Sequence, residues 1–298
     1  MNNQPHFSII IPTLNEASTL PSLLNDLLHQ TWKDFEVIVV DANSEDKTAE
    51  KAEPFRYKFP NFRIIVSQQR NVAYQRNLGA GNAFAHWIIF MDSDDRIPPY
   101  FLQGIKYRIE ATNPDILSTW FQADTHDTKD QAIASIANLY IEIQKTTKKP
   151  SVLEAMLCCK RDVFLRLGGF DTSRTWGEGG ELVERAVKRR LRYEVVRDPK
   201  YTYSLRRLRT QGTLKSTRNI ARLELARLLS KRFSIERTKF LYPMEGGTYF
   251  RKPTEKQVSR LARLVQQLYR NTPLANEPPK QGILSRLFAG KPHTTSQG

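Results

Sequence analysis

Three carboxylates follow a short apolar run near the first third of the chain. Ile88–Met91 is apolar, and Asp92, Asp94 and Asp95 come directly after it. The run predicts a buried β-strand, and carboxylates this close repel one another unless a cation joins them. A divalent ion such as Mg²⁺ or Mn²⁺ takes one or two carboxylates and completes its shell with water and phosphate oxygens. The pattern predicts either an Asp-x-Asp site for a metal and a diphosphate, or a solvated acidic turn.

Further apolar runs predict the sheet that would position these carboxylates. Strands are expected at residues 7–11, 35–41, 62–66, 87–92 and 116–121, with helical segments between them. This alternation is typical of an α/β fold with a doubly wound, mostly parallel sheet and helices on both faces. Ligands of such sheets bind beyond the carboxyl ends of the strands. The strand ends at Thr13–Glu16, Asp41 and Asp92–Asp95 should therefore line one crevice, which favours a site over a solvated turn.

Four short motifs, in this order, resemble those of the family 2 glycosyltransferases. They are Pro12–Glu16 for Pro-x-x-Asn-Glu, Val40–Thr48 for Val-Asp-Asp-Gly-Ser-x-Asp-x-Thr, Arg76–Gly79 for Arg-Asn-x-Gly and Asp92–Asp94 for Asp-x-Asp. Ala42 and Asn43 depart from the second pattern. The resemblance covers about residues 7–210. It implies a GT-A fold, a nucleotide-sugar donor that is usually a UDP-sugar, and transfer with inversion at the anomeric carbon.

The resemblance also implies roles for individual residues. The donor-binding residues would be Pro12, Thr13, Asn15, Glu16, Asp41, Arg76, Asn77, Asp92 and Ser93. The cofactor would be a divalent metal, Mg²⁺ or Mn²⁺, held by Asp92 and Asp94, and it would stabilise the charge that gathers on the leaving diphosphate. Two structural alternatives stay open. Arg76 would pair with one of the aspartates, and Asn77 would pack or cap a helix.

The acceptor side is expected around a Gly-Gly-Phe-Asp turn at residues 168–171 and the segment that follows it. Residues 178–185 are similar to Glu-Asp-x-Glu-Leu-x-x-Arg, but Gly179 replaces the aspartate that the resemblance identifies as the general base. Because inverting transfer needs a carboxylate to take the acceptor proton, the catalytic candidates are Glu181 and Glu178. Alternatively, these glutamates only favour the positive end of a helix dipole. The protein would then be a catalytically impaired GT-A-fold protein that binds nucleotide sugars.

Charge divides the chain into two parts. Residues 1–184 hold 19 basic and 24 acidic residues, whereas residues 185–298 hold 27 basic and 7 acidic ones. The basic part favours anionic partners such as phosphorylated substrates, anionic lipid or nucleic acid. We expect no nucleic-acid partner, because zinc-finger spacing and RNA-binding motifs are absent from the sequence. A nucleotidyltransferase is also disfavoured, since the Gly-rich phosphate loop of that class is missing.

The sequence predicts three regions. Residues 1–212 would be the GT-A domain, with a donor half at about 7–122 and an acceptor half at about 123–212 that includes strands at 192–196 and 201–204. Residues 213–270 would be a basic helical extension. Residues 271–298 would be a proline-bearing linker and a short amphipathic tail, with Ile283, Leu284, Leu287 and Phe288 on one face.

The cellular location follows from what the sequence does not contain. We expect no disulfide between the adjacent Cys158 and Cys159, no signal peptide and no spanning helix. These expectations suggest a cytoplasmic protein. The tail would rest on an anionic membrane at the inner face of the cell membrane, or it would dock on the protein itself.

Overall fold

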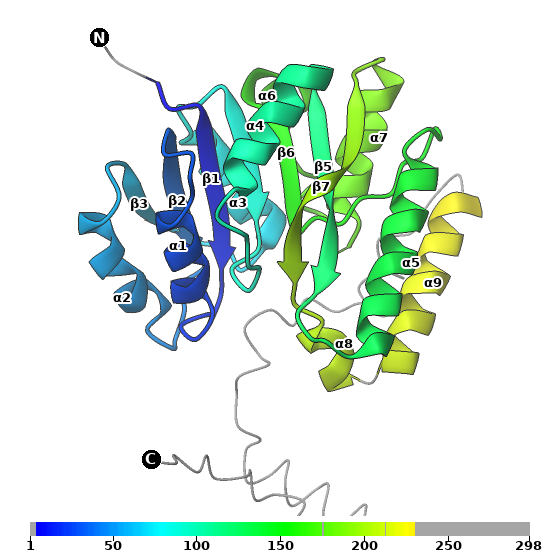
Figure 1. Cartoon of the computed structure of the whole chain (residues 1–298), viewed down its shortest axis with the longest axis horizontal. Helices are drawn as coiled ribbons and strands as arrows, with labels where there is room; N and C mark the ends of the chain where they lie inside the picture. The colour runs from blue at the N-terminus through cyan, green and yellow to red at the C-terminus, as the bar shows by residue number, and fades with distance from the viewer. Residues whose placement is uncertain (1–3, 175, 212, 230–298) are drawn as a thin grey trace, which may run out of the picture. The chain divides into compact units, whose positions relative to one another are not determined.

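The computed structural model of the chain describes residues 4–174, 176–211 and 213–229. They form an α/β fold on a seven-stranded sheet with the order β3-β2-β1-β4-β6-β5-β7 (Figure 1). The strands are β1 Phe7–Thr13, β2 Phe35–Asp41, β3 Phe62–Val66, β4 Trp87–Met91, β5 Ile116–Ala123, β6 Met156–Lys160 and β7 Tyr193–Tyr203. Within this sheet β6 runs antiparallel to both neighbours and the other pairs are parallel. The predicted mostly parallel sheet is confirmed.

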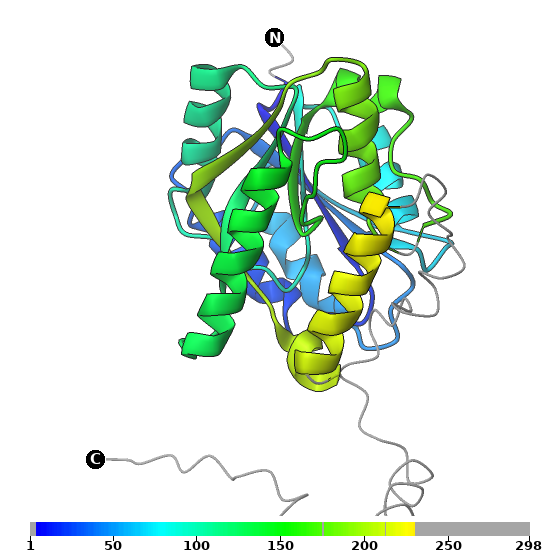
Figure 2. The ribbon, with the colours of Figure 1, turned by 90° about the vertical axis from the view of Figure 1, so that its right-hand side faces the viewer.

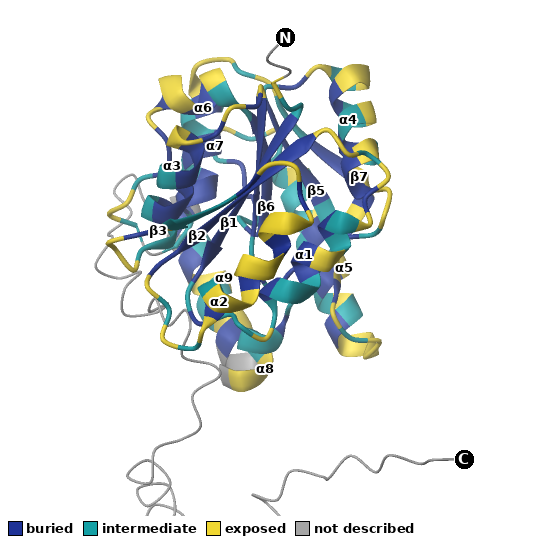
Figure 3. Ribbon diagram, turned by 90° about the vertical axis from the view of Figure 1, so that its left-hand side faces the viewer, coloured by how far each residue is buried: buried dark blue, intermediate teal, exposed yellow. Residues whose placement is uncertain are grey.

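Helices cover both faces of the sheet, as predicted. They are α1 Leu20–Leu28, α2 Thr48–Ala52, α3 Val72–Gly81, α4 Phe101–Thr112, α5 Thr128–Gln144, α6 Arg161–Leu167, α7 Glu178–Lys188, α8 Arg206–Gln211 and α9 Thr213–Leu229. Ile9 and Ile89 share one core with α1, α4 and α5. Ile10 and Phe90 share the other core with α3, α6 and α7. The central strands are therefore buried on both sides (Figure 3), which explains why they read as continuous apolar runs.

Two strands differ from the expectation. The sequence analysis did not predict β6, because this short run holds two cysteines and no β-branched residue. The strands expected at 192–196 and 201–204 are one strand, β7, whose pairing with β5 shifts register between Thr119 and Phe121. Asp198 and Pro199 lie within this strand, at the sheet edge. Proline is tolerated there because an edge strand has backbone groups without a ladder partner.

Close packing fixes α3 against the sheet. A Cβ atom added to Gly79 would collide with Ile10 of β1. Glycine at this position lets the helix approach the strand closely enough to bring Arg76 and Gln75, both buried, beneath the ends of the strands. The Arg-Asn-x-Gly motif thus combines a buried cation with the small residue that allows its placement.

The start of the predicted basic extension is helical. Helix α9 contacts the region of α5, where the Tyr140 hydroxyl donates to Glu224 at 3.3 Å and the Lys149 ammonium donates to the Arg227 carbonyl at 2.8 Å (Figure 2). The rest of the extension, the linker and the amphipathic tail at 230–298 lie outside the described residues. None of the helices described in the structure combines the length and the apolar character needed to cross a membrane.

Candidate active site

The ends of β1 and β2 are joined by a network of side-chain hydrogen bonds. The two strands pair in register from Phe7 to Thr13, so that Pro12 lies beside Val40 and Thr13 beside Asp41. The Thr13 hydroxyl donates to the Asp41 carboxylate at 2.9 Å. That carboxylate, 3% exposed, also accepts from the Ser44 amide and hydroxyl. Three donors satisfy an anion that is otherwise costly to bury.

The loop after β1 is tied to the loop after β2. Asn15 adopts a left-handed backbone with φ 56°, its amide donates to the Ser44 hydroxyl, and its side-chain oxygen accepts from the Glu45 amide at 2.7 Å. The Gln75 amide group of α3 donates to the carbonyl oxygens of Thr13 and Val40. These contacts fix the ends of β1 and β2 relative to each other and to α3. The predicted donor residues Pro12, Thr13, Asn15 and Asp41 therefore lie together.

A buried guanidinium connects the end of β4 to the start of α7. Arg76 is 2% exposed, and it pairs with the Asp92 carboxylate at 2.7 Å and with the Glu178 carboxylate at 3.0 Å. The structural alternative considered for Arg76 is thus present in this structure. Removing either partner of such a buried pair would leave an uncompensated charge. The arrangement places a cation between the predicted donor and acceptor sides. Ser93, which follows Asp92, is buried.

A second arginine pairs with the next carboxylate of the Asp-x-Asp motif. Arg206, which opens α8, lies 3.2 Å from the Asp94 carboxylate and 3.3 Å from that of Glu16. Burial and then the charge of Asp92 raise the pKa of Asp94. Burial also raises the pKa of Glu16, to about 7. A cation offsets the repulsion between neighbouring carboxylates. The chemistry of Asp92 and Asp94 therefore fits a divalent metal.

The third carboxylate of this stretch, Asp95, has different surroundings. Asp95 is fully buried, and neither of its side-chain oxygens has a hydrogen-bond partner among the described residues. Burial and the charges of Asp92 and Asp94 raise its pKa well above the usual value. Asp95 thus differs in its side-chain contacts from Asp92 and Asp94, each of which pairs with an arginine. In the part of the chain that the structure describes, no three metal-ligating side chains gather in one cluster.

On the acceptor side, Asn77 ties α3 to the Gly-Gly-Phe-Asp turn. Its amide nitrogen donates to the Phe170 carbonyl and its oxygen accepts from the Phe170 amide, both at 2.8 Å. The packing alternative for Asn77 is thus what the structure contains, and a role in donor binding stays a prediction. The bond joins residues 93 positions apart in the sequence. It sets the turn that leads into α7.

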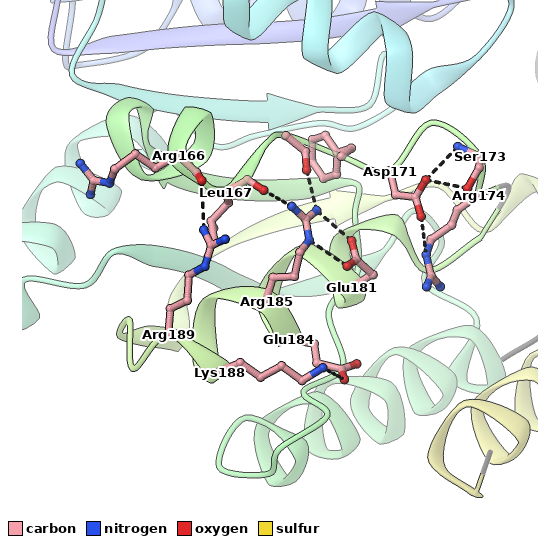
Figure 4. Close-up of polar contacts among 12 residues, drawn as sticks. Arg166, Leu167, Asp171, Ser173, Arg174, Glu181, Glu184, Arg185, Lys188 and Arg189 are labelled. Carbon is pink, nitrogen blue, oxygen red and sulfur yellow. Dashed lines mark hydrogen bonds and ion pairs between the residues drawn. The ribbon is translucent and has the colours of Figure 1, made fainter. Parts of the chain in front are cut away.

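The two predicted catalytic glutamates are placed differently. Glu178 is buried at the first residue of α7, against Arg76. Glu181 lies further along α7. Both of its oxygens pair with Arg185, one turn later on the same helix, at 2.8 Å (Figure 4). Arg185 also donates to the carbonyls of Leu167 and Gly169. The role of Glu181 as a base stays a prediction, but this ion pair gives it a structural function.

Sequence reasoning missed Glu154, which lies before β6. Its carboxylate accepts a hydrogen bond from the Gly179 amide at 3.1 Å. Burial and then the charge of Glu178 raise the pKa of Glu154. A signal existed in the sequence, because Glu154 is a single carboxylate in the otherwise uncharged stretch from Ser151 to Cys159. Gln75 is a further residue of the site that the predicted set did not contain.

Comparisons with known proteins agree with this geometry. A family model described as "Glycosyl transferase family 2" matches residues 8–164. An uncharacterized glycosyltransferase of Haemophilus influenzae is 29% identical over 56% of each chain. The cholesterol galactosyltransferase of Borreliella burgdorferi is 32% identical over 38% of this chain and 32% of its own length. The chain thus spans between about a third and just over half of these curated relatives.

Solved structures show the same fold at low identity. The mannosyltransferase PcManGT of Pyrobaculum calidifontis, in complex with GDP-Man and Mn²⁺, matches with a TM-score of 0.61 at 17% identity, over 96% of this chain and 80% of its own. S. aureus TarS in complex with UDP-GlcNAc matches with a TM-score of 0.53 at 21% identity, over 66% of this chain and 58% of its own. The predicted GT-A fold is confirmed. Because the family match covers more than half of its length, the chain belongs to glycosyl transferase family 2.

Proposed function

We propose that this protein transfers a sugar from a UDP-sugar donor to a hydroxyl group of a glycan or a lipid-linked acceptor, with inversion and with the aid of a divalent metal. The observation that carries the proposal is the convergence of three strand ends and two arginines at one edge of the sheet. A nucleoside diphosphate needs a polar cradle for its base and cations for its phosphates. Both kinds of group are present at this edge.

The donor would lie across the ends of β1, β2 and β4. Asp41, held by Thr13 and Ser44, is a fixed hydrogen-bond acceptor for the base. Arg76 and Arg206 flank Asp92 and Asp94, so they lie where a diphosphate would arrive. Guanidinium groups suit phosphate because their planar donors match its oxygens in pairs. Arg206 would exchange a carboxylate partner for the diphosphate when the donor binds.

The metal would be held by Asp94 together with Asp92. It would supply positive charge to the diphosphate as the leaving group gathers negative charge. The Mn²⁺ named with PcManGT supports this assignment. What the protein's own residues contribute is separate. Arg76 pairs with Asp92 on one side and with Glu178 on the other, so it offsets negative charge on both sides.

We propose a lipid-linked acceptor because of the exposed basic residues of α9. Arg218 and Arg222 of α9 are exposed, and the region after residue 184 is strongly basic. Basic residues near an anionic lipid surface contribute ~1 kcal/mol each. The name of the Borreliella relative gives a lipid acceptor, cholesterol. The protein would then act at the inner face of the cell membrane.

A second candidate is a protein that binds nucleotide sugars without turnover. Gly179 favours it, because the helix start lacks the carboxylate that the family pattern has there. A turnover assay separates the two candidates. The protein is incubated with Mn²⁺ and either UDP-glucose, UDP-galactose, UDP-GlcNAc or GDP-mannose, with octyl glycosides as acceptors. Glycosylated product supports the transferase, whereas donor binding with no product in any pairing supports the binding protein.

Donor binding is tested in the same panel by thermal shift with and without Mn²⁺. A ligand that binds the folded state raises its stability by RT ln(1 + [L]/Kd). We expect one UDP-sugar to raise Tm, and Mn²⁺ to enlarge the increase. If no nucleotide in the panel changes Tm with metal present, the proposed function is wrong.

A further inference from the structure

The start of α7 has no room for a side chain at position 179. A Cβ atom on Gly179 would lie 2.5 Å from Cγ of Glu154 and 3.2 Å from Cγ1 of Val152. Carbon atoms do not approach this closely, so the space next to the Gly179 backbone already belongs to Glu154. The Gly179 amide also donates to the Glu154 carboxylate. Glu154 thus brings a carboxylate to the place from which a side chain at 179 would start.

The topology puts this carboxylate at the same edge of the sheet as the donor site. Strand β6 runs antiparallel to β4, with Met156 opposite Met91. The segment that enters β6 therefore lies beside the segment that leaves β4. The Asp92 amide donates to the carbonyl of Ala155 at 3.0 Å. Glu154 directly precedes Ala155 in the chain. It therefore lies next to the Asp-x-Asp motif, although 62 positions separate Asp92 from Glu154.

Glu154 and Glu178 differ in their partners. Glu178 pairs with the Arg76 guanidinium at 3.0 Å, so its carboxylate is already engaged by a cation. Glu154 forms no salt bridge among the described residues, although the charge of Arg76 acts to lower its pKa, and its hydrogen bond comes from the neutral Gly179 amide. Burial and the nearby charge of Glu178 make its carboxylate more basic. Of the two, Glu154 is better suited to take a proton near neutral pH.

We propose that Glu154 is the general base of the transfer reaction and replaces the carboxylate absent from position 179. The inference rests on the proposed function. As the acceptor oxygen forms its bond to the anomeric carbon, the acceptor proton passes to the Glu154 carboxylate. The bond between the anomeric carbon and the diphosphate oxygen breaks, and its electron pair leaves with the diphosphate. Glu178, held by Arg76, is a positioning residue at the start of α7.

A purely structural role for Glu154 predicts different behaviour. Its carboxylate accepts from a backbone amide in the first turn of α7, so a structural role predicts lower stability with unchanged chemistry when that bond is lost. Glutamine keeps the shape and an oxygen acceptor for the Gly179 amide, but it takes no proton. Glu154→Gln therefore separates the two roles.

The test measures kcat, donor KM and Tm for Glu154→Gln with the donor and octyl glycoside that give the highest turnover in the panel. We expect kcat to fall by ~10²–10⁴-fold, with donor KM and Tm close to wild type and the acid limb of the pH–rate profile lost. Glu184→Gln is the matched control. Glu184 lies on α7, which Glu154 contacts at Gly179, and it pairs with Lys188; its substitution should leave kcat unchanged. A Glu154→Gln enzyme with kcat within threefold of wild type would overturn the inference.

A carboxylate exchange tests the position itself. Glu154→Ala removes the Cγ atom that excludes a side chain at 179, and Gly179→Asp then returns a carboxylate to the same place. We expect the double variant to be at least about tenfold more active than Glu154→Ala alone. No recovery in a double variant that still binds donor by thermal shift would contradict the exchange. Wild type with neither donor binding nor product would instead refute the proposed function, so the two failures are distinguishable.

Discussion

The donor side and the acceptor side of the crevice are built in different ways. On the donor side, Asp41 is fully supplied with hydrogen bonds from Thr13 and Ser44. On the acceptor side, Glu154 and Glu178 lie close together around one guanidinium, and their environment disfavours ionisation of Glu154. A satisfied network holds a rigid shape, whereas crowded carboxylates favour proton uptake. The first arrangement suits recognition of a ligand, and the second suits proton transfer.

The comparison also explains why Arg76 is buried. It contacts both sides, through Asp92 and Glu178. The positive charge of Arg76 offsets the carboxylate charge of Asp92 on the donor side and of Glu178 on the acceptor side. The two sides are thus expected to respond differently to substitution. Substitutions on the donor side should change binding of donor and metal, and those on the acceptor side should change kcat.

The largest expected effect is on the donor side, at Asp94. Asp94→Ala removes the carboxylate proposed to hold the metal, so transfer should fall by about 10³-fold or more. The Mn²⁺-dependent part of the Tm increase with donor should also disappear. Initial rates and thermal shifts at several Mn²⁺ concentrations check both. Near-normal turnover with unchanged metal dependence would show that the metal is held elsewhere.

Arg76→Met should break both sides at once. The substitution leaves Asp92 and Glu178 without their buried cation, and loss of one partner from such a pair costs about 3–5 kcal/mol. Urea unfolding measures the change in the free energy of unfolding. Arg96→Met is the matched control, because Arg96 pairs with Asp26 at the surface and should cost no more than ~1 kcal/mol. Similar losses in the two variants would mean that the Arg76 network contributes little.

Stability should depend on pH through Glu16 on the donor side. Its pKa is raised from 4.5 to about 7 in the folded protein. Between these values the unfolded chain releases the proton and the folded protein keeps it, so rising pH destabilises the folded state. In metal-free protein, the advantage of wild type over Glu16→Gln should shrink by on the order of 2–3 kcal/mol from pH 4.5 to pH 7. Parallel pH profiles for the two proteins would contradict the raised pKa.

Glu181→Gln should have the smallest effect. The variant weakens the ion pair with Arg185, so we expect a loss of about 1–2 kcal/mol in stability and kcat within threefold of wild type. Steady-state kinetics and urea unfolding give both numbers. A fall in kcat of a hundredfold at unchanged stability would restore Glu181 as the catalytic base and remove the contrast between the two sides.

The donor side could be predicted from the sequence because its parts are local. Thr13, Asp41 and Asp92 each end an apolar run, and parallel strands bring their carboxyl ends to one edge. The same reasoning located five strands, although β1 and β5 each extend two residues beyond the expected end. It required no knowledge of which side chains touch.

The acceptor side depends on contacts between distant segments. Glu154 and Gly179 are 25 positions apart, and their contact requires that β6 run antiparallel beside β4. A short strand with two cysteines gives no clear pattern of alternation. The sequence therefore did not indicate β6, nor the importance of Glu154 just before it. Glu181 and Arg185 show another contact that spacing alone does not reveal. Their spacing was read as a motif of catalysis, and the structure adds an ion pair between them within α7, with Arg185 also donating to the Leu167 carbonyl of α6.

The product of transfer tests the central claim most directly. The protein is incubated with Mn²⁺, the α-linked UDP-sugar that raises Tm most, and the octyl glycoside panel, and NMR then reports the anomeric configuration of the product. We predict a β-linked product, since one displacement at the anomeric carbon inverts it. An α-linked product, or donor that binds but yields no glycoside with any acceptor, would contradict the account of an inverting transferase with a working base.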